Sequence, residues 1–207
     1  NKVTVGYQPD ELEIMGEYIY VANSGGYRVP NYDYTVSVVE MYGMKQVEKI
    51  PVGINLHRIR KDAYDQLWVS SRGDYETIPS RLFVLQKKEQ FSSDMIVGDT
   101  LDILCSEMTI LGDSLYFYSV SWNNRTEENA VVQTHELLTD HFITDGTESN
   151  IKIPYGIAVN PYNRDIFVTD AKNYVSSGML HCYDTHGKRK WSVRTGDIPA
   201  HMVFVYK

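Results

Sequence analysis

The feature that most constrains this chain is an aromatic residue that returns at a nearly constant interval. Four such residues lie in short apolar runs, separated by 48, 48 and 51 positions: Tyr20, Trp68, Tyr116 and Phe167. A pair containing Gly, Asn or Asp precedes each run, as in Gly16-Glu17 and Asn163-Arg164. These residue types suit the positive φ angles of tight hairpin turns. A fixed period of this length indicates a repeat architecture.

Two further markers keep the same period and the same order. A glycine closes an apolar stretch at intervals of 47, 45, 48 and 50 residues, at Gly6, Gly53, Gly98, Gly146 and Gly196. An alternating run ends in a polar residue at intervals of 46, 50 and 48, at Glu40, Gln86, Glu136 and Asp184. Because three separate markers agree, chance is a poor explanation for the repeat.

Each period holds four short strands, named a to d here, with strand a innermost. No stretch keeps a helical period with caps. Four antiparallel strands in each period of about 40 to 50 residues are typical of a β-propeller blade. We therefore predict an all-β chain with a β-propeller fold. A β-sandwich is the competing all-β interpretation, but it gives no reason for a constant period.

The repeat divides one predicted domain, residues 1–207, into four blades and two orphan strands. The blades span residues 9–53, 54–98, 99–146 and 147–196. Residues 1–6 match a strand d of a preceding blade, and residues 199–206 match a closing strand a. We expect the C-terminal part of a larger propeller, closed by upstream blades or by a second copy of the chain. A distorted ring of four blades is the alternative.

Several stretches resemble a known propeller repeat. Tyr20-Val21-Ala22-Asn23-Ser24, Thr35-Val36-Ser37-Val38-Val39 and Ile50-Pro51-Val52-Gly53 resemble the YVTN-type repeat of surface-layer, NHL-like β-propellers. Pro154-Tyr155-Gly156-Ile157-Ala158-Val159 and Ile166-Phe167-Val168-Thr169-Asp170 are similar to its other half. The third repeat departs from the pattern, since Tyr118-Ser119 stands where the family has Thr-Asn.

This resemblance implies a protein of the bacterial cell envelope. Proteins of the family are secreted to the periplasm or cell surface, often as lipoproteins with an anchor upstream, and commonly have about seven blades. Most serve a binding or scaffolding role. The resemblance therefore implies an extracytoplasmic location and a partner that is a glycan, a peptide or another envelope protein.

Composition excludes several functions. The net charge of −7 and the pI of about 5.3 argue against a nucleic-acid partner, which would need a basic surface. No apolar run approaches the roughly 18 residues needed to span a membrane. Cys105 and Cys182 lie in separate apolar runs, which favours two buried free thiols. A single disulfide between them is the alternative.

The loops between strands b and c are the predicted binding surface. They are long and aromatic, at about residues 25–34, 72–80, 121–129 and 171–177. Their candidate ligand-binding residues are Tyr27, Tyr32, Tyr34, Tyr75, Trp122 and Tyr174. Long loops on a rigid scaffold concentrate binding residues, and flat aromatic rings suit sugars or partner side chains. Alternatively, these rings fold back onto neighbouring blades.

A second candidate site is the ring of inner strands. Positions four and five residues after the closing glycines are largely polar: Asp10, Glu11, His57, Arg58, Asp102 and His201, with Tyr155 as the equivalent in the fourth repeat. His57, Arg58, Tyr155 and His201 are candidate ligand-binding residues. Asp10, Glu11 and Asp102 are candidate ligands of a divalent cation such as Ca²⁺. Otherwise no cofactor is expected, and a hydrated polar channel is the alternative.

The sequence favours a non-catalytic binding or scaffold propeller, because it carries no recognisable catalytic signature. A metal-assisted hydrolase or lyase with Asp, Glu and His at the channel mouth is the alternative. A purely structural surface-layer component is a third interpretation. Arg72-Gly73-Asp74 spells a tripeptide that integrins read, but three residues occur together by chance.

Overall fold

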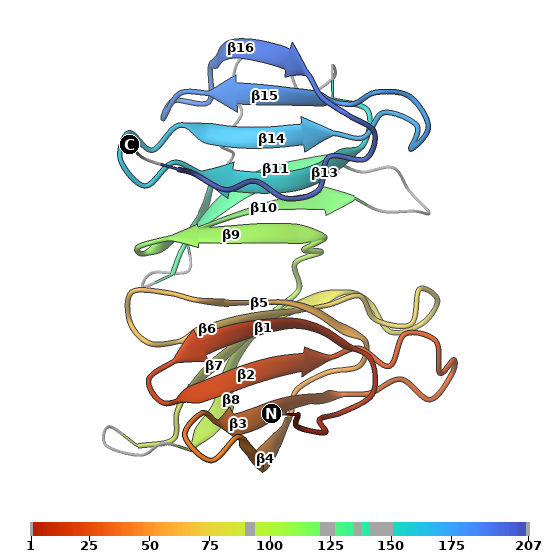
Figure 1. Cartoon of the computed structure of the whole chain (residues 1–207), viewed down its shortest axis with the longest axis vertical. Coiled ribbons are helices and arrows are strands. Elements are labelled where there is room, and N and C mark those ends of the chain that lie inside the picture. Colours follow the sequence, from red (N-terminus) through yellow and green to blue (C-terminus); the bar gives the residue numbers. More distant parts are fainter. Residues whose placement is uncertain (1, 90–93, 121–126, 135–137, 141–150, 206–207) are drawn as a thin grey trace. The chain divides into compact units, whose positions relative to one another are not determined.

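The computed structural model describes residues 2–89, 94–120, 127–134, 138–140 and 151–205. These residues form strands and loops, and no helix among them could cross a membrane. The chain forms two compact units, residues 1–105 and 106–207. Each unit contains two four-stranded sheets (Figure 1). The all-β prediction, with four strands in each repeat, is confirmed.

The strands follow the chain in four consecutive groups. The first unit holds β1 (Pro9–Met15), β2 (Tyr18–Asn23), β3 (Thr35–Glu40), β4 (Lys45–Pro51), β5 (Leu56–Lys61), β6 (Leu67–Ser71), β7 (Arg81–Lys87) and β8 (Met95–Leu101). The second holds β9 (Glu107–Leu111), β10 (Ser114–Val120), β11 (Glu127–Gln133), β12 (Leu138–Asp140), β13 (Pro154–Val159), β14 (Ile166–Asp170), β15 (Met179–Tyr183) and β16 (Arg189–Arg194).

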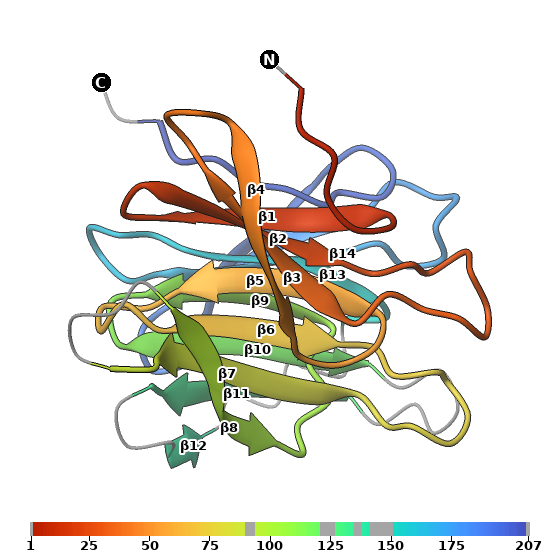
Figure 2. The ribbon, with the colours of Figure 1, turned by 90° about the horizontal axis from the view of Figure 1, so that it is seen from below.

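Every sheet is an antiparallel meander, ordered as its strands occur in the chain. The tight turns between first and second strands contain a residue with positive φ, at Gly16, Asp65, Gly112 and Arg164. This confirms the turn positions predicted from sequence. The sheets of the first unit twist strongly, so that β4 runs across the direction of β1 (Figure 2).

The hydrophobic core of each unit lies between its two sheets. In the first unit, Tyr20 and Val38 of one sheet pack in a cluster with Ile59, Leu67 and Val69 of the other. Alternate residues of a strand face the same side, so this set is one face of each sheet. Each fully buried aliphatic side chain contributes about 1.5 to 3 kcal/mol to folding.

The second unit repeats this arrangement with larger side chains. Tyr116 and Tyr118 of β10 pack in a cluster with Ile157, Val168 and Tyr183 of the other sheet. Of the four regularly spaced aromatic residues that revealed the repeat, Tyr20, Trp68 and Tyr116 are buried, and Phe167 is half-buried. They recur because each blade must fill the same space beside its neighbour.

The two orphan segments form no strand within the described chain. Residues 2–8 lie against the β2–β3 loop, where Tyr7 and Gln8 carbonyls accept hydrogen bonds from Gly25 and Ser24. Residues 195–205 lie against the last sheet, where Phe204 meets Phe167 edge to face at 5.3 Å. A strand needs a paired neighbour, so pairing of these segments with other blades stays a prediction.

One closing glycine does not end its strand. β8 continues three residues past Gly98, to Leu101. Asp102 therefore lies in the connection between β8 and β9 rather than on an inner strand, and the prediction that placed it there is wrong. Both cysteines are free and buried, as the sequence predicts. Gly146, Glu136 and Trp122 lie outside the described residues.

Candidate functional site

The two b–c loops of the first unit are joined through one buried residue, Asn55. Its backbone N–H donates to the Asp33 carbonyl at 2.9 Å, and its own carbonyl accepts from the Arg72 N–H at 3.0 Å. Its side-chain amide donates to the Gly73 carbonyl at 3.0 Å. Asn55 has a φ of 55°, a conformation that asparagine tolerates better than most residues. The loops, residues 24–34 and 72–80, leave the same end of the unit (right side of Figure 1).

One aspartate shapes each loop through hydrogen bonds to backbone N–H groups. The Asp33 carboxylate accepts hydrogen bonds from the backbone N–H groups of Tyr7, Tyr34 and Thr35 at 2.7–3.0 Å. Burial would raise the pKa of Asp33, but these hydrogen bonds outweigh burial and lower it. The Asp74 carboxylate likewise accepts from three N–H groups of its own loop, which lowers its pKa to about 2. Asp74 therefore has a structural role in closing its loop.

Glycines let both loops fold back on themselves. Gly25 and Gly73 have positive φ angles of 59° and 65°. A Cβ at either position would collide with the backbone on the far side of its own loop. The glycine requirement, together with the hydrogen bonds of the two aspartates, fixes the loop shapes.

The loops display their tyrosines rather than burying them. Tyr27 is 95% exposed, and Tyr34 and Tyr75 are about half exposed. Tyr7, on the segment that lies against the first loop, is also exposed, and the Arg28 guanidinium sits 3.7 Å from its ring centroid. We call Tyr7, Tyr27, Tyr34 and Tyr75 the tyrosine surface.

The remaining predicted aromatics are distributed differently. Tyr32 is half-buried in the first loop. In the second unit, Tyr155 of β13 and Tyr174 of the β14–β15 loop meet edge to face, with centroids 5.9 Å apart. Because the two rings pack against each other, they offer a ligand less exposed aromatic surface than the tyrosines of the first unit do.

The inner-strand prediction brings together Asp10 of β1 and His57 of β5. His57 Nδ1 lies 2.9 Å from Asp10 Oδ2. Arg72, the first residue of the β6–β7 loop, completes the cluster: its Nη1 donates to Asp10 Oδ2 at 2.9 Å, and its Nη2 lies 2.6 Å from His57 Nδ1. Sequence reasoning named Asp10 and His57 but missed Arg72, which it weighed only as part of a tripeptide.

The cluster holds Asp10 ionised and His57 neutral. Burial would raise the pKa of Asp10, but the His57 hydrogen bond and the Arg72 charge outweigh it and lower that pKa to about 2. Burial lowers the pKa of His57, and the hydrogen bond to Asp10 opposes this without reversing it. At neutral pH, the cluster is an ion pair between Asp10 and Arg72 with an uncharged imidazole beside it.

The carboxylates predicted as metal ligands form hydrogen bonds and ion pairs with neighbouring protein groups. Glu11 accepts from the Ile59 N–H at 3.0 Å and pairs with Arg60. Asp102 pairs with Arg81 at 2.9 Å. Among the described residues, no group of three or more His, Cys, Asp or Glu side chains could hold a metal ion. The prediction of a cation site at Asp10, Glu11 and Asp102 is therefore not supported by the geometry.

The other inner-strand candidates have different surroundings, although the positive charge of Arg58 also lowers the pKa of His57. Arg58 is half-buried on β5, and its N–H donates to the Ser70 hydroxyl at 3.0 Å. His201 is exposed in the last segment of the second unit, which forms no strand within the described residues.

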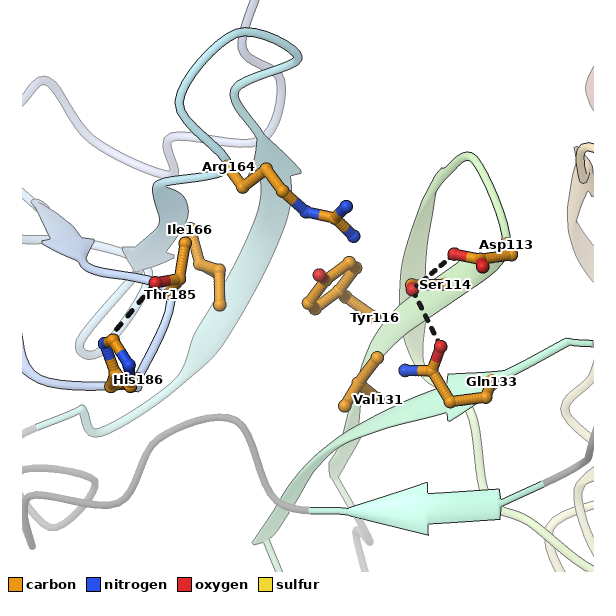
Figure 3. A pocket seen from close by; sticks show the side chains of 9 residues that line it. All are labelled: Asp113, Ser114, Tyr116, Val131, Gln133, Arg164, Ile166, Thr185 and His186. Atoms are coloured by element: carbon orange, nitrogen blue, oxygen red, sulfur yellow. Dashed lines mark hydrogen bonds between the residues drawn. The ribbon is translucent and has the colours of Figure 1, made fainter.

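The second unit contains a cleft that sequence reasoning missed. Its volume is about 520 Å³, and it lies between the β9–β12 and β13–β16 sheets, at the end opposite the β14–β15 loop (Figure 3). Tyr116, Gln133 and Arg164 are among its lining residues. One signal was present in the sequence: Arg164 occupies the positive-φ turn position that other repeats fill with Gly or Asp.

No protein-family model matches this sequence, and a search of curated proteins finds no relative. Solved structures do resemble it. The AfRom2 CNH domain matches with a TM-score of 0.60 and 11% identity, over 96% of this chain and 62% of that one. The Dos1 propeller matches with a TM-score of 0.57 and 11% identity, over 87% of this chain and 45% of that one.

A bacterial protein is also similar in structure. PorZ, described as an essential bacterial surface component of the type-IX secretion system of Porphyromonas gingivalis, matches with a TM-score of 0.52 and 12% identity. The match covers 92% of this chain and 21% of PorZ. This chain thus spans less than two thirds of each of the three proteins. At such low identity the likeness shows the fold alone, and that fold is a β-propeller.

Proposed function

We propose that this chain is part of a non-catalytic β-propeller that binds a protein partner at the bacterial cell envelope through the tyrosine surface. The observation that carries the proposal is the exposure of four tyrosines on and beside two loops that Asn55 joins. Exposed tyrosines on a preorganised frame are typical of binding surfaces, because the rings offer large contact areas at low entropic cost.

The loops behave as a scaffold by their hydrogen bonding. Asp74 accepts backbone N–H bonds within its own loop, from Glu76, Thr77 and Ile78. Asp33 accepts those of Tyr34 and Thr35 where its loop meets β3, and that of Tyr7 in the segment beside the loop. Asn55 then fixes one loop against the other. Little ordering remains to be done on binding, so the free energy of each tyrosine contact is largely retained in the affinity.

The envelope location rests on the YVTN-type resemblance and on the similarity to PorZ. A protein partner is preferred to a glycan because Arg28 lies over the Tyr7 ring and adds a charge to the aromatic surface. Tyrosine and arginine together are the residues most often enriched at protein interfaces. Binding of a glycan is kept as an outcome of the test.

The test selects phage-displayed peptides, and screens bacterial envelope glycans, against the wild-type chain. Binders are then measured on the double variant Tyr27→Ala and Tyr75→Ala. The control is Tyr42→Ala, which removes a 99% exposed tyrosine from the β3–β4 turn at the other end of the first sheet. We expect the loop variant to weaken selected peptides about tenfold or more and the control to leave them unchanged.

Two results would count against the proposal. If the selected peptides bind the loop variant as tightly as wild type, the tyrosine surface is not the binding site. If glycans bind with the expected dependence on Tyr27 and Tyr75 while peptides do not, the site is kept but its partner class is wrong.

A further inference from the structure

The cleft of the second unit has a positively charged wall that no described residue neutralises. Arg164 lies in the β13–β14 turn, and Figure 3 shows its guanidinium directed into the cleft toward Tyr116. Within the described part of the chain, no carboxylate lies within ion-pair distance of it. An unpaired guanidinium in a concave site is a natural place for an anion.

The carboxylates close to Arg164 in the sequence form interactions with other groups. Asp165, the next residue, is buried and pairs with Lys190 at 2.7 Å. Asp184 accepts the N–H groups of His186 and Lys188 within its own turn, at 2.9 and 3.0 Å. These contacts explain why Arg164 stays free although acidic residues are close in sequence.

The opposite wall is polar and uncharged except at its rim. The Ser114 hydroxyl lies 3.1 Å from Gln133 Oε1 and 3.0 Å from Asp113 Oδ1. Because its oxygen faces Ser114, the Gln133 side chain turns its amide nitrogen toward the cleft (Figure 3). Asp113 adds an acceptor. Such a mixture of donor and acceptor suits the hydroxyl groups of a sugar.

Apolar atoms complete the lining. Val131 and Ile166 contribute aliphatic surface, and Tyr116 contributes part of an aromatic ring. The volume of about 520 Å³ falls in the ordinary range for small-ligand sites. A single guanidinium balances one negative charge, whereas Asp113 would repel a dianion such as a phosphate ester.

We propose that this cleft binds an acidic sugar, with its carboxylate at Arg164 and its hydroxyl groups at Gln133 and Asp113. The site is independent of the tyrosine surface, since it lies in the other unit and at the turns between strands. The two proposals can therefore fail separately.

The test measures binding of D-glucuronate to the chain by calorimetry or NMR titration. D-glucose supplies the matched neutral sugar, and acetate supplies a carboxylate without a sugar. The variants are Arg164→Gln, which removes the charge, and Gln133→Glu, which keeps an acceptor for Ser114 and adds a negative charge. The control is Lys188→Gln, which removes an exposed positive charge outside the lining.

We expect D-glucuronate to bind about tenfold or more tightly than either D-glucose or acetate. Arg164→Gln and Gln133→Glu should each weaken D-glucuronate by about tenfold, while Lys188→Gln changes little. Equal weakening by Arg164→Gln and Lys188→Gln would mean a diffuse charge effect and would overturn the proposal. Equal affinity for D-glucuronate and acetate, or for D-glucuronate and D-glucose, would also overturn it.

Discussion

Replacing Asp10 by asparagine should destabilise the first unit at neutral pH but not in strong acid. Asp10 of β1 reaches His57 of the neighbouring inner strand and Arg72 of the next b–c loop. Its folded pKa of about 2 lies below its ordinary value of 3.8. Its ionised form therefore stabilises the fold above about pH 4, and this contribution disappears as the pH falls from about 4 to about 2.

The magnitude follows from the size of that pKa change. A fall from 3.8 to about 2 corresponds to roughly 2.5 kcal/mol at about 1.4 kcal/mol per pH unit. The Asp10 side chain is 25% exposed, so solvent screening reduces the effect. We expect Asp10→Asn to lower the free energy of unfolding by about 1 to 2 kcal/mol at pH 7.

The assay is urea unfolding at a series of pH values, followed by circular dichroism. Asp102→Asn is the matched control, because Asp102 also pairs with an arginine but its side chain is 83% exposed. The control should cost less than about 0.5 kcal/mol at every pH. The reasoning is refuted if both variants lose the same stability, or if the deficit of Asp10→Asn is unchanged near pH 2.

Three further predictions concern residues near this cluster and elsewhere. The pKa of His57, followed by NMR, should rise in Arg72→Gln, which removes a nearby positive charge. It should fall further in Asp10→Asn, which removes the negative charge of its hydrogen-bond partner, and shifts of the same sign in the two variants would contradict this reasoning. Asn55→Gly should lower the free energy of unfolding by about 1 to 3 kcal/mol, because it removes the buried hydrogen bond to the Gly73 carbonyl. Asn55→Ala should lower it by about 1 kcal/mol more, because alanine is strained at the positive φ of this position. Equal urea midpoints for the two variants would contradict the expected strain. Burial raises the pKa of Cys182 to about 11, so mass spectrometry should find this thiol unalkylated by iodoacetamide at pH 8 until urea unfolds the chain.

The sequence was sufficient to predict the blades because their turns and cores repeat with local chemistry. A residue able to take positive φ is needed at each tight turn, and a large apolar residue is needed at each blade core. Each requirement restricts the type of residue at one position of the repeat. Both are therefore visible as a periodic pattern in the sequence. Tyr20 and Trp68 show the second need, and Gly16 and Gly112 show the first.

Counting from the closing glycines failed at Asp102 for a physical reason. The count assumed that each glycine ends its strand. At Gly98 the strand continues, and a Cβ there would meet the end of the Gln86 side chain, which lies close over the glycine. At Gly53 the collision would be with Phe83. The glycine thus marks a close approach of a neighbouring side chain, which sequence spacing cannot distinguish from a strand end.

The roles of Arg72 and Arg164 could not be predicted because they depend on contacts distant in sequence. Arg72 meets Asp10 across 62 residues, at a position where the first repeat has Ser24. The freedom of Arg164 follows from the pairing of Asp165 with Lys190 across 25 residues. Neither pairing belongs to the repeat pattern, so periodicity gives no sign of it.

The inner-strand position that holds His57 serves a structural purpose in both units. His57 of β5 contacts Arg72 at the start of the b–c loop in its own sheet. The equivalent residue of the fourth repeat, Tyr155 of β13, contacts Tyr174 of the b–c loop in its sheet. The chemistry differs completely, one contact being polar and the other aromatic, but each fastens an inner strand to its loop. In both repeats this position therefore supports a loop, whatever the chemistry of the contact. These contacts hold the b–c loops in place. In the first unit, binding should therefore depend on the loops themselves, which display Tyr27 and Tyr75.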